Sequence, residues 1–342
     1  MSELDPELAA VVRDIEATGV PQWHALSVAG ARRVEDELFT TDASVPVGSV
    51  RNLAFEGPHG EVPVRVYRPE RDDEADDASD GGGAAGDGGE SGRDPLPTVV
   101  FFHGGGFVMG TLDSAGDLCR RLASRADCVV VSVDYHLAPE HRFPVAVDDA
   151  FAALRWTAAN ARAFGGDPDR LGVAGSSAGG ALAAATALRA REAADREVGG
   201  APALRHLLLF YPMLDRDLDR ESYAANADGP LLTRADVRWF WEQYLRSPVD
   251  AANPYAAPLR APDLGGLPPS TVVTAGRDPL RDEGDAFAGR LDAADVPTDH
   301  LHYPRMCHGF LSLADRVGAA DAAFDDVAAR TREHLGVDGG DG

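Results

Sequence analysis

The most informative segment of this chain is Gly175-Ser176-Ser177-Ala178-Gly179, which has the form G-x-S-x-G. The apolar residues 171–174 before it are typical of a buried parallel strand. The segment Ala181–Arg191 after it is rich in good helix formers. The chain must therefore turn sharply between the two, and a glycine on either side of Ser177 permits this turn. Ser177 is a candidate nucleophile, although an ordinary glycine-rich turn has the same letters.

A serine hydroxyl needs a base to activate it, and the base needs a third group to orient it. Residues 271–275 read as a β-branched strand, and Asp278 follows just past its end, at the sheet edge where ligands bind in α/β proteins. A further strand is expected over Asp299–Tyr303, and His308 lies in the loop after it. The order Ser177, Asp278, His308 is that of α/β-hydrolases and differs from that of chymotrypsin or subtilisin.

Other acidic and histidine residues near these positions have simpler explanations. Asp282 and Glu283 are expected in the first turn of a helix, where the helix dipole favours acidic side chains. His300 and His302 lie two residues apart, hence on one face of a strand. We expect these histidines to be packed or solvated and not catalytic.

The developing negative charge on a substrate carbonyl also needs hydrogen-bond donors. A buried-strand pattern over Thr98–Phe102 ends in the segment His103-Gly104-Gly105-Gly106. Such a segment supplies backbone N–H groups to an oxyanion hole, together with the N–H of Ala178. A flexible glycine loop is the simpler alternative. A dinucleotide-binding loop is excluded, because Met109 stands where the G-x-G-x-x-G pattern needs its last glycine.

These motifs together resemble the hormone-sensitive lipase family of α/β-hydrolases, in its bacterial and archaeal esterase form. The segments Asp134–Pro144 and Asp278–Gly284 are similar to the family's D-Y-R-L-A-P-E-H-P-F-P and D-P-L-x-D-E-G segments. Tyr211-Pro212-Met213 and Trp239-Phe240-Trp241 also fit. The chain departs from the family at Ser176, where Asp or Thr is usual, and at His136, where Arg is usual, and neither change removes a catalytic atom.

The resemblance implies roles for particular residues. Gly105 and Gly106 would supply the loop donors of the oxyanion hole with Ala178, while His103 would shape the loop and not act as the base. A helical lid would cover the serine. The side chains expected to contact the substrate are Phe107, Tyr211, Trp239 and Phe240, and plain helix packing is the alternative for each aromatic residue of the segment 213–255.

The resemblance also implies an activity. It implies hydrolysis of short- to medium-chain carboxylic esters through an acyl-enzyme, with a small-molecule ester as partner and no cofactor. An amidase or an acyltransferase would use the same triad. A small-molecule receptor on the same fold is the non-enzymatic alternative, but plant receptors of this family have lost the catalytic histidine and His308 is present here.

The expected fold is an α/β-hydrolase, with a mostly parallel sheet of about eight strands flanked by helices and a helical cap. N-terminal cap helices are expected over 1–50, and a second cap segment over 213–255. The core is expected over 51–212 and 256–336, and starts with an antiparallel hairpin.

Two further segments are expected to be disordered. Residues 71–92 are dense in Asp, Glu, Gly and Ala and contain no large apolar residue, so they cannot offset their ordering entropy and are expected to form an insertion loop. The tail 337–342 is similar.

The charge balance excludes several functions. The 32 basic and 56 acidic residues give a net charge of −24, and every basic residue is arginine. Nucleic-acid binding is therefore not expected, and the lack of lysine excludes Ser-Lys hydrolases, Schiff-base enzymes and Walker A loops. Such an acidic excess indicates adaptation to a salt-rich cytoplasm. A moderately acidic protein from a GC-rich genome is the alternative.

The remaining expectations concern location and assembly. Three cysteines provide no disulfide framework, and the acidic N-terminus does not resemble a secretory signal, which favours a cytoplasmic protein. No apolar stretch is long enough for a membrane anchor. The sequence has no H-E-x-x-H motif or cysteine pair, so no metal site is expected. A homodimer is compatible with the sequence.

Overall fold

A single eight-stranded sheet forms the centre of the molecule. The computed structural model describes residues 3–40, 45–71, 94–196 and 201–337. The strand order is β1-β2-β4-β3-β5-β6-β7-β8. The strands are β1 (Ser49–Gly57), β2 (Gly60–Arg68), β3 (Leu96–Phe102), β4 (Val129–Val133), β5 (Gly166–Ser176), β6 (Leu204–Phe210), β7 (Ser270–Arg277) and β8 (Thr298–Cys307). The β1–β2 hairpin is antiparallel and pairs antiparallel with β4, whereas all pairs from β4 to β8 are parallel. The expected α/β-hydrolase architecture is confirmed.

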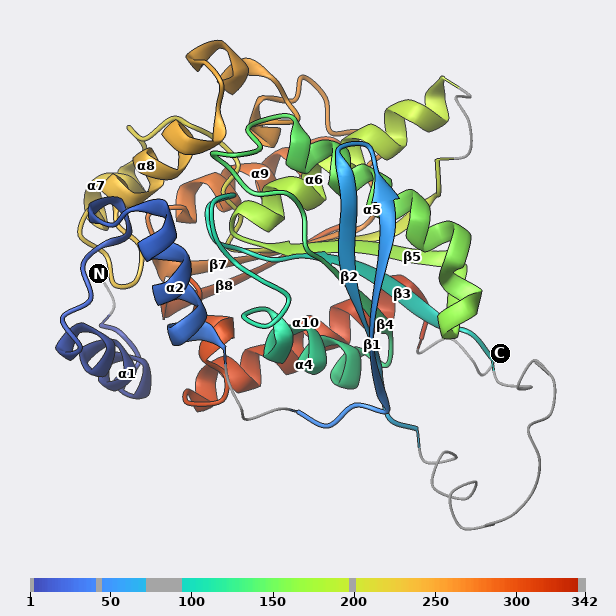
Figure 1. Ribbon diagram of the computed structural model, residues 1–342, viewed down its shortest axis with the longest axis horizontal. Helices are drawn as coiled ribbons and strands as arrows, with labels where there is room; N and C mark the ends of the chain where they lie inside the picture. Colours follow the sequence, from blue (N-terminus) through green and yellow to red (C-terminus); the bar gives the residue numbers. More distant parts are fainter. Residues whose placement is uncertain (1–2, 41–44, 72–93, 197–200, 338–342) are drawn as a thin grey trace.

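Helices cover both faces of the sheet (Figure 1). The α-helices are α1 (Pro6–Ala17), α2 (Val28–Phe39), α4 (Gly116–Ala126), α5 (Val145–Asn160), α6 (Ala178–Asp195), α7 (Glu221–Ala225), α8 (Arg234–Tyr244), α9 (Arg281–Asp292) and α10 (Gly318–Leu335). Short 3₁₀ helices are η1 (Trp23–Ala25), η2 (Ala161–Phe164), η3 (Pro248–Ala252), η4 (Pro258–Arg260) and η5 (Phe310–Leu313). Helices α5, α6 and α9 pack on one face, and α4 and α10 pack on the other.

The alternation of side chains along the strands produces these two cores. In β3, which is buried along its whole length, Val100 and Phe102 join the core beneath α5 and α6. Val99 and Phe101 join the core beneath α4 and α10. Successive side chains of a strand point to opposite faces, so a continuous apolar run is what a strand covered on both faces requires.

The described residues 3–40 and the segment 213–255 lie outside the sheet and contact each other. The Trp23 indole donates to the carbonyl of Leu231 at 2.9 Å, and the His24 ring lies 2.8 Å from the Asp236 carboxylate. Figure 1 shows α1 and α2 on the same side of the molecule as α7 and α8. The two segments therefore form one layer next to the carboxyl ends of the parallel strands.

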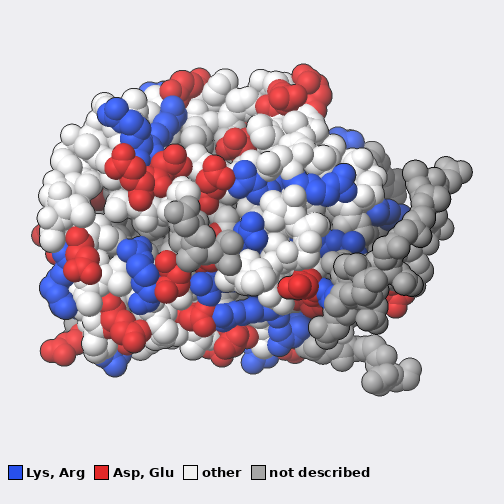
Figure 2. Space-filling model, turned by 60° about the horizontal axis from the view of Figure 1, so that its bottom comes forward, with Lys and Arg blue, Asp and Glu red and all other residues white. Residues whose placement is uncertain are grey.

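Nearly all of the predicted loop 71–92, and all of the predicted tail except Val337, fall outside the described residues. None of the helices in the described ranges combines the length and apolar character that crossing a membrane requires. On the face drawn in Figure 2, acidic and basic side chains are interspersed. Many of the arginines in the described ranges pair with carboxylates, as Arg32 does with Glu140 at 2.7 Å.

Candidate active site

Ser177 lies at the sharp turn between β5 and α6. Its backbone has φ 54° and ψ −117°, a strained conformation for a residue with a side chain. The Ser177 N–H donates to the carbonyl of Phe210, at the end of the neighbouring strand β6, at 2.8 Å. A Cβ atom on Gly175 would lie 2.1 Å from the Gly179 carbonyl oxygen, and one on Gly179 would lie 2.0 Å from that of Phe102. Glycine is therefore required on both sides of the serine.

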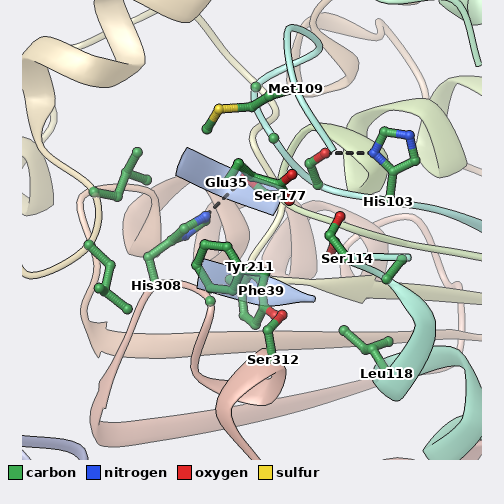
Figure 3. Close-up of a pocket in the computed structure, with 18 of the residues that line it drawn as sticks. Glu35, Phe39, His103, Met109, Ser114, Leu118, Ser177, Tyr211, His308 and Ser312 are labelled. Atoms are coloured by element: carbon green, nitrogen blue, oxygen red, sulfur yellow. Dashed lines mark hydrogen bonds between the residues drawn. The ribbon is translucent and has the colours of Figure 1, made fainter. Parts of the chain in front are cut away.

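The structure brings the three predicted triad residues together (Figure 3 shows the serine and the histidine). Ser177 Oγ lies 3.0 Å from His308 Nε2, and His308 Nδ1 lies 2.8 Å from Asp278 Oδ2. The Asp278 carboxylate is fully buried, and its other oxygen accepts the Leu280 N–H at 2.8 Å. This arrangement fits the histidine tautomer that donates from Nδ1 to Asp278 and presents the Nε2 lone pair to the serine hydroxyl.

The glycine loop after β3 presents its backbone toward the same site. Gly105 and Gly106 have φ values of 103° and 61°, and the Gly105 carbonyl accepts the N–H groups of Val108 and Met109, both at 3.0 Å. Within the described part of the chain, the N–H groups of Gly105 and Gly106 donate to no protein acceptor. Ala178 begins α6, so its N–H has no partner within the helix. These groups are suited to stabilise an oxyanion.

His103 does not face the serine hydroxyl as a base. Its ring stacks on Tyr135 with a centroid distance of 4.3 Å, and its Nδ1 lies 2.8 Å from the Gly104 carbonyl. The Tyr135 hydroxyl donates to the His103 carbonyl at 2.9 Å. Burial lowers the pKa of His103, so the neutral ring is favoured. The contacts of His103 hold the glycine loop in place.

A cavity of about 100 Å³ adjoins the serine. Of the four predicted substrate contacts, Tyr211 and Phe240 line it. Phe107 is buried elsewhere, with its ring centroid 3.7 Å from that of Tyr244, and Trp239 packs beside Phe240 without lining the cavity. Neither Phe107 nor Trp239 lines this cavity; the ring of Phe107 is taken up by its stacking on Tyr244, and Trp239 points in a different direction from its neighbour Phe240.

Sequence reasoning missed several cavity residues, of which Glu35 on α2 is the most unusual (Figure 3). Glu35 lines the cavity with Ser177 and is only 7% exposed. Burial raises its pKa to about 7, against the effect of hydrogen bonds from Ser114 and Gly110. Other apolar lining residues that were missed are Trp23, Phe39, Met109, Leu118, Leu231 and Leu232. No local pattern marks a residue of α2 as part of a site built mainly by distant segments.

Glu283 occupies the first turn of α9, as the sequence predicted. It is also completely buried. Its carboxyl accepts the N–H groups of Leu214 and Asp215 at 2.6 and 2.9 Å and the Tyr223 hydroxyl at 2.6 Å. Burial raises its pKa to about 8. These hydrogen bonds to Glu283 join α9 to the segment after β6.

Residues 99–312 match a protein family described as the alpha/beta hydrolase fold. The chain is 42% identical over 288 residues to the carboxylic ester hydrolase LipN of Mycobacterium tuberculosis, an alignment that covers 84% of this chain and 70% of that protein. It is 36% identical over 340 residues to the ethyl acetate hydrolase of Pseudomonas putida, covering 97% and 99% of the two chains.

Solved structures agree with these sequence relatives. The ester-hydrolase EH1AB1 from the metagenome of Lake Arreo superposes with a TM-score of 0.84 at 38% identity, over 97% of this chain and 99% of that one. A Pyrobaculum calidifontis esterase has a TM-score of 0.82 at 34% identity, over 96% and 98% of the two chains. Together with the residues around Ser177, these likenesses show that the chain belongs to the hormone-sensitive lipase family of α/β-hydrolases.

Proposed function

We propose that this chain is a serine carboxylesterase that hydrolyses short- to medium-chain esters through an acyl-enzyme intermediate. The observation that carries the proposal is the continuous hydrogen-bonded chain from Ser177 Oγ through His308 to the buried Asp278. Relatives named as esterases and carboxylic ester hydrolases support the reaction class.

In the first half of the reaction, Ser177 Oγ attacks the ester carbonyl carbon while His308 Nε2 accepts the hydroxyl proton. Asp278 stabilises the imidazolium that forms. The N–H groups of Gly105, Gly106 and Ala178 donate to the oxyanion of the tetrahedral intermediate. As the intermediate collapses, His308 returns the proton to the leaving alkoxide, and the acyl group remains on Ser177.

In the second half, a water molecule takes the place of the departed alcohol. His308 Nε2 accepts a proton from this water as its oxygen attacks the acyl carbon. The second tetrahedral intermediate collapses, and the proton returns to Ser177 Oγ as the carboxylic acid is released. The small, mainly apolar cavity beside the serine supports a preference for short acyl chains.

We propose a cap function for the segments 1–50 and 213–255 around the core segments 51–212 and 256–336. The cavity is lined by Trp23, Glu35 and Phe39 from the first segment and by Leu231, Leu232 and Phe240 from the second. Substrate selection would therefore depend on side chains outside the core, while the chemistry depends on core residues.

Salt adaptation, a cytoplasmic location and homodimer formation stay predictions. The net charge of −24 supports the first, because such a charge repels itself unless ions screen it. Three free, buried thiols, Cys119, Cys128 and Cys307, are compatible with a reducing compartment.

The experiment that tests the proposed activity is hydrolysis of p-nitrophenyl esters from acetate to decanoate at molar salt. We expect the wild-type kcat/KM to peak at a short chain, and Ser177→Ala to lower kcat by about 10⁴-fold or more. Ser176→Ala is the matched control, because it removes the neighbouring hydroxyl and leaves the triad intact. Activity retained by a folded Ser177→Ala variant would contradict the proposal.

A p-nitroanilide with the same acyl group separates an esterase from an amidase, since only the leaving group differs. Added alcohol acceptors test the acyltransferase alternative by the transesterified product. A folded wild-type protein that binds esters tightly without turnover would instead favour the receptor.

A further inference from the structure

A second group of chemically reactive side chains lies away from the cavity that contains Ser177. Asp285 on α9 and His300 and His302 on β8 each place one potential ligand atom so that the three atoms lie within 4.8 Å of one another. Strand β8 is the edge of the sheet, and α9 packs across β7 and β8 (Figure 1). The group is therefore located where a helix meets the open edge of the sheet.

The two histidines share a face because they are two residues apart on one strand. Thr274 of β7, which pairs with His302 in the sheet register, orients both rings. Its hydroxyl oxygen lies 2.9 Å from His300 Nε2 and 2.8 Å from His302 Nδ1. Both imidazoles thus direct a ring nitrogen toward one point.

Asp285 completes the group from the helix side. Its Oδ1 atom is buried and pairs with His300 Nε2 at 3.2 Å. The nearby cation Arg281 makes its close ion pair with Asp282, at 2.7 Å, and its Nε stays 4.0 Å from the other oxygen of Asp285. Oδ1 therefore pairs with His300 and not with Arg281, and a metal ion bound by both residues would take the place of this contact.

Two imidazoles and one carboxylate are a ligand set that suits zinc and similar divalent metals. With bonds of about 2.0–2.1 Å, two ligands of one tetrahedral zinc lie roughly 3.4 Å apart. The distance between His300 and Asp285 already fits this value. His302 is exposed, so its ring can rotate the remaining distance without displacing packed neighbours.

We propose that Asp285, His300 and His302 form a binding site for a divalent transition-metal ion, with zinc as its expected occupant. The ion would join α9 to the edge strand β8, and water would complete its coordination. The site is separate from the residues that contact the ester and takes no part in hydrolysis. From the sequence we expected no metal, because these ligands come from two elements and match no contiguous motif.

Zinc titration of the full-length, metal-free protein at pH 7.5, followed by calorimetry, tests the proposal. We expect one zinc ion to bind per chain, with His300→Ala and His302→Ala each weakening the affinity by at least about tenfold. His59→Ala is the matched control, since His59 also sits near a surface carboxylate, that of Asp148 at 3.1 Å, and it should bind zinc like the wild type.

Two further readouts separate a specific site from general binding to an acidic surface. Cobalt bound by the wild type should give visible absorption of a low-symmetry, histidine-ligated ion, and His302→Ala should lose it. Zinc should raise the melting temperature of the wild type but not of His302→Ala, because an ion bound only to the folded state stabilises it. Absence of zinc binding, or equal binding by the wild type and both variants, would overturn the proposal.

Discussion

Replacing Glu35 by glutamine should stabilise the protein, and the gain should grow as the pH rises. The Glu35 side chain is 7% exposed, and its Oε2 atom has no hydrogen-bond partner among the described residues. Burial raises the pKa of this carboxyl from 4.5 to about 7. The folded protein therefore prefers the protonated form and holds its proton at pH values where the unfolded chain has lost it.

The sign and size of the effect follow from this difference. A carboxyl with a raised pKa contributes stability that is fully present below about 4.5 and is lost as the pH rises through about 7. One pKa unit corresponds to about 1.4 kcal/mol. Relative to low pH, ionisation of Glu35 therefore lowers the free energy of unfolding of the wild type by about 3 kcal/mol at pH 8, but by only about 1 kcal/mol at pH 5. Glutamine cannot ionise and keeps an oxygen that can accept the bonds from Ser114 and Gly110.

Urea denaturation measures this effect, at molar salt and at several pH values from 5 to 8. The quantity compared is the difference in free energy of unfolding between Glu35→Gln and the wild type. Every other titrating group cancels in this difference. Glu37→Gln is the matched control, because Glu37 lies on the same helix but is exposed, and its difference should stay near zero. A Glu35→Gln advantage that is the same at pH 5 and pH 8 would refute the reasoning.

Three further perturbations have definite expected outcomes. Gly106→Ala should lower kcat by about 10² to 10³, because the new Cβ would lie 2.1 Å from the Phe240 ring and Gly106 has a φ of 61°. The control is Gly289→Ala in α9, where a Cβ meets open space. This variant should keep full activity, and its free energy of unfolding in urea should rise by about 1 kcal/mol. Tyr223→Phe should cost about 1–3 kcal/mol of unfolding free energy, since it removes the hydroxyl that donates to the buried Glu283 carboxyl, and an unchanged denaturation midpoint would show that this bond is dispensable. Dialysis from molar to millimolar salt should lower the melting temperature by several degrees, and a constant melting temperature would remove the case for salt adaptation drawn from the net charge of −24.

The sequence was sufficient to predict the sheet and the positions of the triad residues at the ends of its strands. A G-x-S-x-G turn works only with small residues on both sides, and the contacts that a Cβ would make at Gly175 and Gly179 show why. The strand before Asp278, β7, could be recognised because a strand buried on both faces must be continuously apolar or β-branched. The strand before His308, β8, is the partly exposed edge of the sheet, and it could be recognised by its alternation of polar and apolar residues from His300 to Tyr303. Local constraints of this kind can be recognised directly in the sequence.

The cavity lining and the histidine cluster could not be predicted in the same way. Phe107 and Phe240 are both aromatic residues near the site in sequence terms. In the structure Phe107 packs against Tyr244, and Phe240 lines the cavity beside the serine. Glu35 and Asp285 reach their partners from helices, and such helix positions look like ordinary acidic positions in the sequence. These features depend on contacts between distant segments, which no local pattern records.

The placement of Phe240 connects substrate selection with the proposed stabilisation of the oxyanion. Its ring occupies the space that a side chain at Gly106 would need, so α8 is pressed against the backbone whose N–H group is proposed to stabilise the oxyanion. A smaller residue at position 240 would enlarge the cavity and at the same time loosen the glycine loop. Leu231 and Leu232 also line the cavity, but a side chain at Gly106 would meet the Phe240 ring first, so changes at the two leucines would mainly alter the space for substrate. Substrate range can therefore vary through Leu231 and Leu232 more freely than through Phe240.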